Sequence, residues 1–343
     1  MMITRRNALA GAAALTMAGR SLPARSEASS IVVGTWGGDY GALLQQNIDV
    51  PLVKPLGIEV SQDIGNNDPR RTKLISEKAS RRGSMDVACI NDIDSFVLSQ
   101  MGILDQVEEK AVPRLGQVLP VFRKPNTIPH IYSALVVLYN PTKVTTPPKS
   151  YADLLDPKYK GRVGFSDILY SYNMAGINLG AGGTPGDFSK GRAALMDLKK
   201  LDPKVYPSNE ALAAALKTEE VWLSTMWLAR GFMWKQSGIP IAWSVPENGA
   251  IPILFEAGVP KNSRSKEGAF KYLNAMLDPQ AQVAFAAKMG YVPTVKDAKL
   301  PEDLAKQISL TEAQQARLHP LDYAFMQSQQ AANLDFWSKE FKA

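Results

Sequence analysis

The sequence predicts an α/β protein with two domains. Strand and helix patterns alternate with short connections through the first third of the chain, which is typical of a mostly parallel sheet covered by helices. A second set of strands and helices begins near residue 151. About 315 residues are expected in the mature chain, and nearly half of them are apolar, so two cores can be buried.

Residues 1–28 are predicted to be an export signal that is removed. Arg5 and Arg6 precede an apolar run over residues 8–18, and small residues at positions 26 and 28 suit a signal peptidase. The apolar run is too short to cross a bilayer. The paired arginines favour the twin-arginine route, so the mature chain is expected in the periplasm.

Composition argues against several classes of protein. Removal of four arginines and one glutamate with the signal would lower the formal net charge from +6 to +3, which is too small for a nucleic-acid-binding protein. Cys89 is the single cysteine and lies in an apolar run, so it is expected to be a buried hydrophobe. Two histidines and one cysteine argue against a zinc or copper site. The basic pairs at 70–71 and 81–82 are interpreted as the solvated ends of one helix.

The first predicted strand ends in a turn that is a candidate binding site. The apolar run Ile31–Gly34 leads to Trp36, a pair of glycines, and a helical segment. Such a turn lies at the carboxyl end of a strand, where ligands bind in α/β sheets. Trp36, Gly38, Asp39 and Tyr40 would then face a cleft. The alternative is an ordinary turn with Trp36 in the core, because the full phosphate-loop signature is missing.

The remaining predicted elements follow in order along the chain. Strands are expected at Gly57–Ser61, Met85–Ile90, Ile128–Pro141, Arg162–Phe165, Val221–Trp227, Ile239–Val245 and Ile251–Val259. Helices are expected at Pro69–Arg82, from the Asn91-Asp92 turn to Gly102, at Tyr151–Leu155, from Asp167 to Gly180, and at Ser189–Leu201, Asn209–Lys217, Lys266–Leu277 and Pro279–Lys288. Asp278 is expected to cap the last of these helices and Gly290 to end it.

Three stretches together resemble one family. They are Leu138–Val144 with Ser150–Gly161, Pro246–Ile251, and Val259–Ala269 with Asp278–Gln282. In this order they resemble the bacterial solute-binding proteins of ABC importers, in the branch of the spermidine/putrescine-binding proteins. The resemblance implies the two-lobed periplasmic binding protein fold of type II, with mixed sheets and crossing hinge strands. It also implies a first lobe of residues 29–134 plus 251–300 and a second lobe of 135–250 plus 301–343.

The resemblance also implies further ligand-binding residues. They are Asn91 and Asp92 after the third strand, Tyr132 and Ser133 before the crossing, Asp167 at a helix start, and the aromatic Trp227. Each has a structural alternative. Tyr132 could serve packing, Trp227 could belong to the core, and Asp167 could only cap its helix.

Two departures from the polyamine-binding pattern affect the expected ligand. Tyr170 and Phe255 stand where polyamine binders place acids, and Glu256 would point to the other face of its strand. Arg230 adds a cation near the same wall. A desolvated second ammonium would therefore lack a carboxylate, which costs several kcal/mol. The expected solute is a polyamine-like or zwitterionic amino compound, with the balance favouring the zwitterion.

The leading interpretation is a monomeric, non-enzymatic protein that captures a small solute and presents it to an inner-membrane ABC permease. No resident cofactor or metal is predicted. A ferric-ion carrier of the same fold is an alternative, although no adjacent tyrosine pair occurs. An exported hydrolase is a further alternative, since Asp92 and Asp167 could mimic a glycosidase pair, but opposing acids equally make a cation clamp. The G-x-S-x-G and H-E-x-x-H motifs are missing from the sequence.

Overall fold

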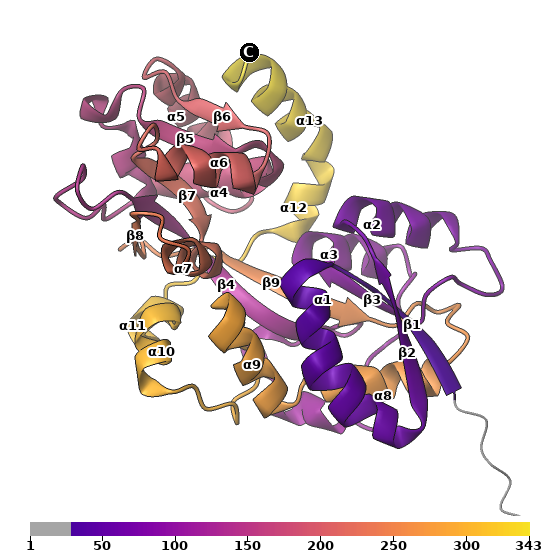
Figure 1. Ribbon diagram of the computed structural model, residues 1–343. Helices are drawn as coiled ribbons and strands as arrows, with labels where there is room; N and C mark the ends of the chain where they lie inside the picture. The colour runs from indigo at the N-terminus through magenta and orange to yellow at the C-terminus, as the bar shows by residue number, and fades with distance from the viewer. Residues whose placement is uncertain (1–28) are drawn as a thin grey trace, which may run out of the picture.

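The computed structural model of the protein describes residues 29–343, so the predicted export signal lies outside the described residues. The chain forms two lobes, which we name by their strands (Figure 1). Lobe one is built on β1, β2, β3, β9 and β10, and lobe two is built on β5, β6, β7 and β8. The long strand β4, Ile128–Tyr139, contributes to both.

The sheet of lobe one is mixed. β1 pairs in parallel with β2 and β3, as the repeated strand and helix pattern predicts. β9 is antiparallel to both β3 and β4. The strands are β1 (Ser29–Thr35), β2 (Ile58–Ile64), β3 (Val87–Asn91), β9 (Pro252–Gly258) and the short β10 (Val292–Pro293). The predicted α/β class is confirmed, and Cys89 on β3 is fully buried as expected.

The sheet of lobe two is also mixed. β5 (Val163–Ser166) lies in parallel between β6 (Lys204–Tyr206) and β7 (Leu223–Trp227). β7 and β8 (Ala242–Ser244) are both antiparallel to β4.

Strand β4 changes partner in its middle. Ala134 pairs with Pro252 of β9, whereas the next residue, Leu135, pairs with Trp227 of β7. The backbone N–H of Leu135 also donates to the carbonyl of Ile251, 2.8 Å away, just before β9 begins. Two chain segments therefore cross between the lobes side by side at this point.

Helices cover both sheets (Figure 1). Lobe one carries α1 (Gly38–Leu44), α2 (Asn67–Ser76), α3 (Asp92–Gln100), α8 (Lys266–Met276) and α9 (Pro279–Met289). Lobe two carries α4 (Tyr170–Gly180), α5 (Ser189–Lys199), α6 (Asn209–Lys217) and α7 (Leu228–Gln236). The predicted ends of α9 are confirmed, because Asp278 accepts hydrogen bonds from two N–H groups of its first turn and Gly290 has a φ of 72°. Within residues 29–343, no helix is both long enough and apolar enough to cross a membrane.

The helix predicted for Pro69–Arg82 is shorter than expected, and one residue of its first basic pair, Arg70, is not solvated. α2 ends at Ser76, and the Asn262 side chain donates to the carbonyl of Glu77 just beyond it. Arg70 is buried, and its guanidinium donates to the carbonyls of Thr35, Gly65 and Cys89. Arg70 thus joins the ends of β1 and β3 instead of facing water.

The chain after residue 300 forms helices that the sequence analysis did not predict. They are α10 (Glu302–Ile308), α11 (Glu312–Gln315), α12 (Tyr323–Ser328) and α13 (Gln330–Asp335). α12 packs against α3 of lobe one, and α13 packs against α4 of lobe two. In Figure 1 these two yellow helices run from α3 along the side of lobe two. This C-terminal segment therefore contacts both lobes.

His130 on β4 is a fully buried titratable group in lobe one. Its Nδ1 shares a 2.8 Å hydrogen bond with the hydroxyl of Tyr40, while its Nε2 has no partner among the described residues. Burial disfavours the charged imidazolium and lowers the pKa of His130 from 6.5 to about 3.

Stability should decrease as the pH falls below about 6.5, in part because of His130. The unfolded chain takes up the proton near pH 6.5, whereas the folded chain resists it down to about pH 3, so the unfolded state binds more protons in this window. The loss should reach roughly 2 kcal/mol at pH 5. Urea unfolding of the mature protein and of His130→Gln at pH 7 and pH 5 measures it. The variant should show a smaller pH dependence, and equal pH dependence in both proteins would contradict the prediction.

Candidate functional site

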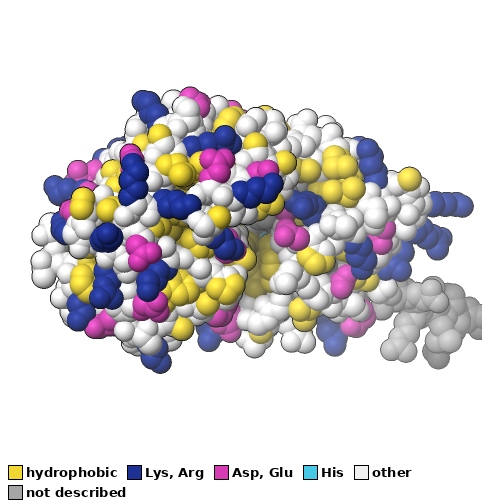
Figure 2. Space-filling view, turned by 90° about the horizontal axis from the view of Figure 1, so that it is seen from above, with side chains coloured by type: hydrophobic (Ala, Val, Ile, Leu, Met, Phe, Trp, Pro, Cys, Tyr) yellow, Lys and Arg dark blue, Asp and Glu magenta, His cyan; other side chains and the backbone are white. Residues whose placement is uncertain are grey.

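A cleft with a volume of about 570 Å³ lies between the two lobes. Figure 2 shows a hollow in the surface between the two halves of the molecule, with hydrophobic side chains inside it. Lobe one contributes the turn after β1, and lobe two contributes the turn after β7 and the start of α6. The cleft therefore lies at the carboxyl ends of strands, where ligands bind in α/β proteins.

Several helices begin at this cleft. Asn67 of α2, Asn91 before α3, Asn209 of α6 and Trp227 before α7 all line it. The first N–H groups of a helix lack partners within the helix and carry a positive partial charge. Together these helix starts favour a negatively charged or strongly accepting group of a ligand.

Aromatic rings form the walls of the cleft. On lobe one, the Trp36 ring meets the rings of Tyr40 and Phe255 edge to face, with centroids 5.0 and 5.2 Å away. On lobe two, Trp227 meets Tyr172 in the same manner at 4.6 Å. Offset and edge contacts of this kind fix the ring orientations. The walls are therefore flat, apolar surfaces on both lobes.

Two residues that line the cleft from lobe two, Arg230 and Asn209, each carry a buried polar atom without a partner in the described part of the chain. The Nε of Arg230 and the Oδ1 of Asn209 are buried and have no hydrogen-bond partner among residues 29–343. Burial raises the pKa of the nearby Tyr291, and the positive charge of Arg230 opposes that rise. A buried donor or acceptor without a hydrogen-bond partner costs free energy, unless a ligand supplies the partner.

Two carboxylates line the cleft near solvent. The side chain of Asp39 in lobe one is 45% exposed, and its nearest cation is the Lys288 Nζ at 3.9 Å. Glu210 of lobe two is exposed at the start of α6. The cleft thus offers both a cation and carboxylates.

The structure brings most of the predicted site residues together in this cleft. Those that line it are Trp36, Gly38, Asp39, Tyr40, Asn91, Trp227, Arg230 and Phe255. Trp227 is only 4% exposed, so it both packs in the core and forms a wall. Glu256 points to the opposite face of β9, as expected, and is buried there. Ligand binding by these residues stays a prediction.

Asp167 and Tyr170 line a side chamber of about 500 Å³ instead of the main cleft. The chamber shares Asn91, Ile168 and Tyr172 with the cleft, so the two spaces are adjacent. The Asp167 carboxylate accepts a 2.7 Å hydrogen bond from the Trp337 indole and pairs with the ammonium of Lys342. Both partners come from the end of the chain, so they already satisfy this acid.

Asp92, Tyr132 and Ser133 line neither space, although the resemblance places them at the ligand. Tyr132 is buried against Phe122, with ring centroids 4.7 Å apart, which fits the packing alternative. The Ser133 hydroxyl accepts a 3.1 Å hydrogen bond from the N–H of Ala229 in the first turn of α7. Both side chains are buried by these contacts, so neither contributes to the cleft surface.

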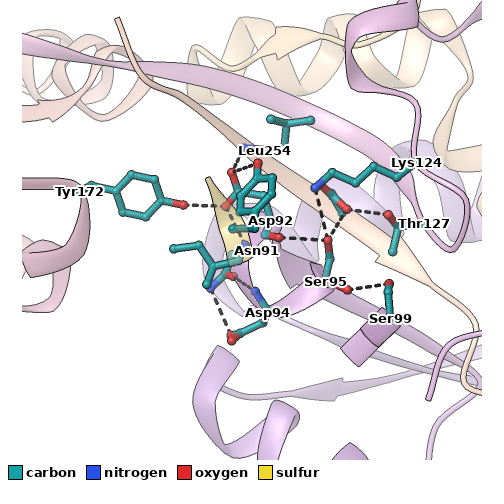
Figure 3. Close-up of polar contacts among 12 residues, drawn as sticks. Asn91, Asp92, Asp94, Ser95, Ser99, Lys124, Thr127, Tyr172 and Leu254 are labelled. Carbon is teal, nitrogen blue, oxygen red and sulfur yellow. Dashed lines mark hydrogen bonds and ion pairs between the residues drawn. The ribbon is translucent and has the colours of Figure 1, made fainter. Parts of the chain in front are cut away.

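Asp92 is fully buried and is bound by the protein itself (Figure 3). Its Oδ1 accepts from the Tyr172 hydroxyl at 2.5 Å, and its Oδ2 accepts from the Tyr323 hydroxyl at 3.0 Å. Burial raises the pKa of the Asp92 carboxyl, while the charge of Lys124 and these hydrogen bonds oppose the rise. Its oxygens are therefore engaged, and it contributes no open carboxylate to the cleft.

A second buried carboxylate lies beside it. Glu256 pairs with the ammonium of Lys124 and accepts 2.6 Å hydrogen bonds from the hydroxyls of Ser95 and Thr127 (Figure 3). Burial raises the pKa of the Glu256 carboxyl. The charge of Lys124 and the hydrogen bonds from these partners act to lower it, but burial has the larger effect.

Sequence reasoning missed other residues that line the cleft. They are Gly37, Asn66, Asn67, Ile131, Ile168, Leu169, Tyr172, Asn209, Glu210, Met233, Ile253, Met289 and Tyr291. The Ser208 cap of α6 marks a helix start in the sequence, and Asn209 and Glu210 follow it directly. A helix start alone does not show which helices meet at one cleft, because this depends on the pairing of distant strands.

Among residues 29–343, no cluster of three or more His, Cys, Asp or Glu side chains has the arrangement of a metal site. The arrangement in the cleft is instead that of a binding site, with aromatic walls, a few polar groups and helix starts at one place.

Comparisons with known proteins agree with this geometry. Residues 58–312 match the model of a family described as bacterial extracellular solute-binding protein. The spermidine/putrescine-binding periplasmic protein of Escherichia coli strain K12 is 29% identical over 250 residues, which are 68% of this chain and 70% of that protein.

Solved structures show the same fold. An ABC transporter substrate-binding protein from Bradyrhizobium japonicum USDA 110 is 20% identical with a TM-score of 0.78, covering 90% of this chain and 99% of the other. The structure described as the Atu4243-GABA receptor has the same identity and TM-score, covering 92% and 98%. The predicted type II periplasmic binding protein fold is thereby confirmed. Since the family match spans most of its length, the chain belongs to the bacterial extracellular solute-binding proteins, which are the non-catalytic solute-binding components of ABC transporters.

Proposed function

We propose that this protein captures a small amino compound carrying one positive nitrogen and one carboxylate or amide, and presents it to the inner-membrane permease of an ABC importer from the periplasm. The observation that carries the proposal is Arg230, which lines the cleft and whose buried Nε has no partner among the described residues. A polyamine is the second candidate, since relatives such as the Escherichia coli protein are named for spermidine and putrescine.

A carboxylate or amide oxygen of the ligand suits the Arg230 end of the cleft. A guanidinium recognises carboxylate oxygens through a planar set of donors, and a hydrogen bond to a charged group contributes about 1.5–3 kcal/mol. The helix starts at Asn209 and Trp227 add positive partial charge on the same lobe. An all-cationic ligand would meet like charge here.

A single positive nitrogen suits the rest of the cleft. Asp39 and Glu210 supply negative charge, and the Oδ1 of Asn209 is an acceptor without a partner. Trp36 and Trp227 also line the cleft, and aromatic rings attract cations. A zwitterion thus has a positive nitrogen for the carboxylates of the cleft and a carboxylate for Arg230.

Among the described residues, the predicted acids Asp92 and Asp167 offer no open carboxylate to a second ammonium. Asp92 is buried and bound by two tyrosines, and Asp167 is held by Trp337 and Lys342. Tyr170 and Phe255 replace the other acids that the polyamine pattern requires. A buried ammonium without a partner costs several kcal/mol, so linear polyamines should bind weakly.

Calorimetric titration of the mature protein tests the ligand class. We expect 4-aminobutanoate or glycine betaine to bind at least about tenfold more tightly than spermidine or putrescine, which corresponds to about 1.4 kcal/mol. Choline serves as a probe with the cation but no carboxylate. Submicromolar binding of spermidine, with no response to either zwitterion, would establish the polyamine alternative and overturn the proposal.

Replacing the cleft cation should affect carboxylate-bearing probes selectively. Arg230→Gln should weaken binding of the best zwitterion by about tenfold or more, because it removes a charge-assisted hydrogen bond, and should leave choline binding nearly unchanged. Lys235→Gln is the control, since this exposed residue on the same helix makes the same charge change outside the cleft lining. An equal loss in both variants would point to a general charge effect and against a specific contact.

Trp227 should contribute to binding as well as to stability. Trp227→Ala should weaken binding by roughly 1–3 kcal/mol, as expected for a buried aromatic contact, and ligand should change tryptophan fluorescence in the parent protein. Trp222→Ala is the matched control, because this half-buried tryptophan of lobe two does not line the cleft. If folded Trp227→Ala binds as tightly as the parent, Trp227 serves the core alone.

A further inference from the structure

The buried carboxylate of Asp92 joins parts of the chain that are distant in sequence (Figure 3). Asp92 is the first residue of α3 in lobe one. Tyr172 reaches it from α4 of lobe two, and Tyr323 reaches it from α12 of the C-terminal segment. The backbone N–H of Leu254, near the point where β9 leaves the crossing, is 3.4 Å from its Oδ2. One side chain therefore contacts both lobes, the C-terminal segment and the crossing strand.

Asp92 depends on these donors because no cation among residues 29–343 pairs with it directly. The ammonium of Lys124 is engaged by Glu256 and lies 4.5 Å from the centroid of the Tyr323 ring. A buried carboxylate that loses a hydrogen-bond donor bears a large desolvation cost. The two phenol hydroxyls are thus strongly favoured to stay within reach of Asp92.

The ring of Tyr172 links its hydrogen bond with Asp92 to the cleft. It lines both the cleft and the side chamber, and it meets the Trp227 wall at a centroid distance of 4.6 Å and an angle of 89°. Tyr323 stacks on Phe96 of lobe one at 5.8 Å, so the C-terminal segment is held on the same side. The position of one cleft wall therefore depends on a carboxylate from the opposite lobe.

We propose that Asp92 is a positioning residue that ties lobe two and the C-terminal segment to lobe one and sets the width of the cleft in the ligand-free protein. Asp92 acts through Tyr172 and does not touch the solute. A purely structural role would instead lower the stability of the fold and leave the angle between the lobes unchanged.

The test measures the distance between the lobes without any ligand, so its result does not depend on the solute's identity. Thr72→Cys on α2 and Ala214→Cys on α6 place spin labels at exposed positions of the two lobes, and the fully buried Cys89 does not compete for label. Pulsed electron paramagnetic resonance then gives the distribution of inter-label distances in the mature protein.

The variants Tyr172→Phe and Tyr323→Phe each remove one hydroxyl and keep the ring. Tyr272→Phe is the matched control, because its hydroxyl also donates to a buried carboxylate, that of Asp49 at 2.8 Å, but within lobe one. We expect Tyr172→Phe to shift the distribution to longer distances or broaden it, Tyr323→Phe to do so less, and the control to match the parent.

Urea unfolding and near-ultraviolet circular dichroism confirm in parallel that the variants are folded. Asp92→Asn is a further variant, which keeps the shape of the side chain and should also broaden the distribution. If Tyr172→Phe and Asp92→Asn lose stability but keep the parent distance distribution, the role of Asp92 is structural and the proposal is overturned.

Discussion

The shared use of strand β4 is the constraint on which the rest of the structure depends. Because β4 exchanges β9 for β7 as its partner between Ala134 and Leu135, a single strand holds two sheets edge to edge. The carboxyl ends of strands in each sheet then face one space, and the helices that follow begin there. The cleft, its aromatic walls and its positive helix starts all result from this change of partner.

Polar groups in and beside the cleft are of two kinds in this protein. The carboxylates of Asp92, Asp167 and Glu256 are satisfied by hydroxyl, indole or ammonium groups of the chain itself. Arg230 and Asn209 instead line the cleft and each keep a buried polar atom without a partner among the described residues. A chain related to polyamine-binding proteins therefore need not bind a polyamine. An ammonium group of a ligand can pair only with carboxylates that the protein's own side chains do not already engage.

Tyr172 belongs both to the contacts between the lobes and to the walls of the cleft. Its hydroxyl belongs to the network of Asp92, while its ring belongs to the walls of the cleft and the side chamber. A change in the angle between the lobes would therefore alter the surface that a solute meets. The C-terminal segment takes part through Tyr323, so the end of the chain contributes to the geometry of the site.

Local pattern alone determined the class of the fold, most helices and strands, and the cleft turn from Trp36 to Tyr40. The family resemblance added Asn91, Trp227, Arg230 and Phe255 to the cleft lining. Alternating strands and helices, the cap at Asp278 and the turn from Trp36 to Tyr40 are short-range features, and they appear where the sequence predicts them. Only the tertiary structure decided which polar groups have partners within the protein and which do not. Arg70 is buried because three carbonyls from separate segments converge on it, and Asp92 is closed by tyrosines 80 and 231 residues further along the chain. Partners so distant in sequence leave no periodic or capping signal, because they meet only after the sheets have paired.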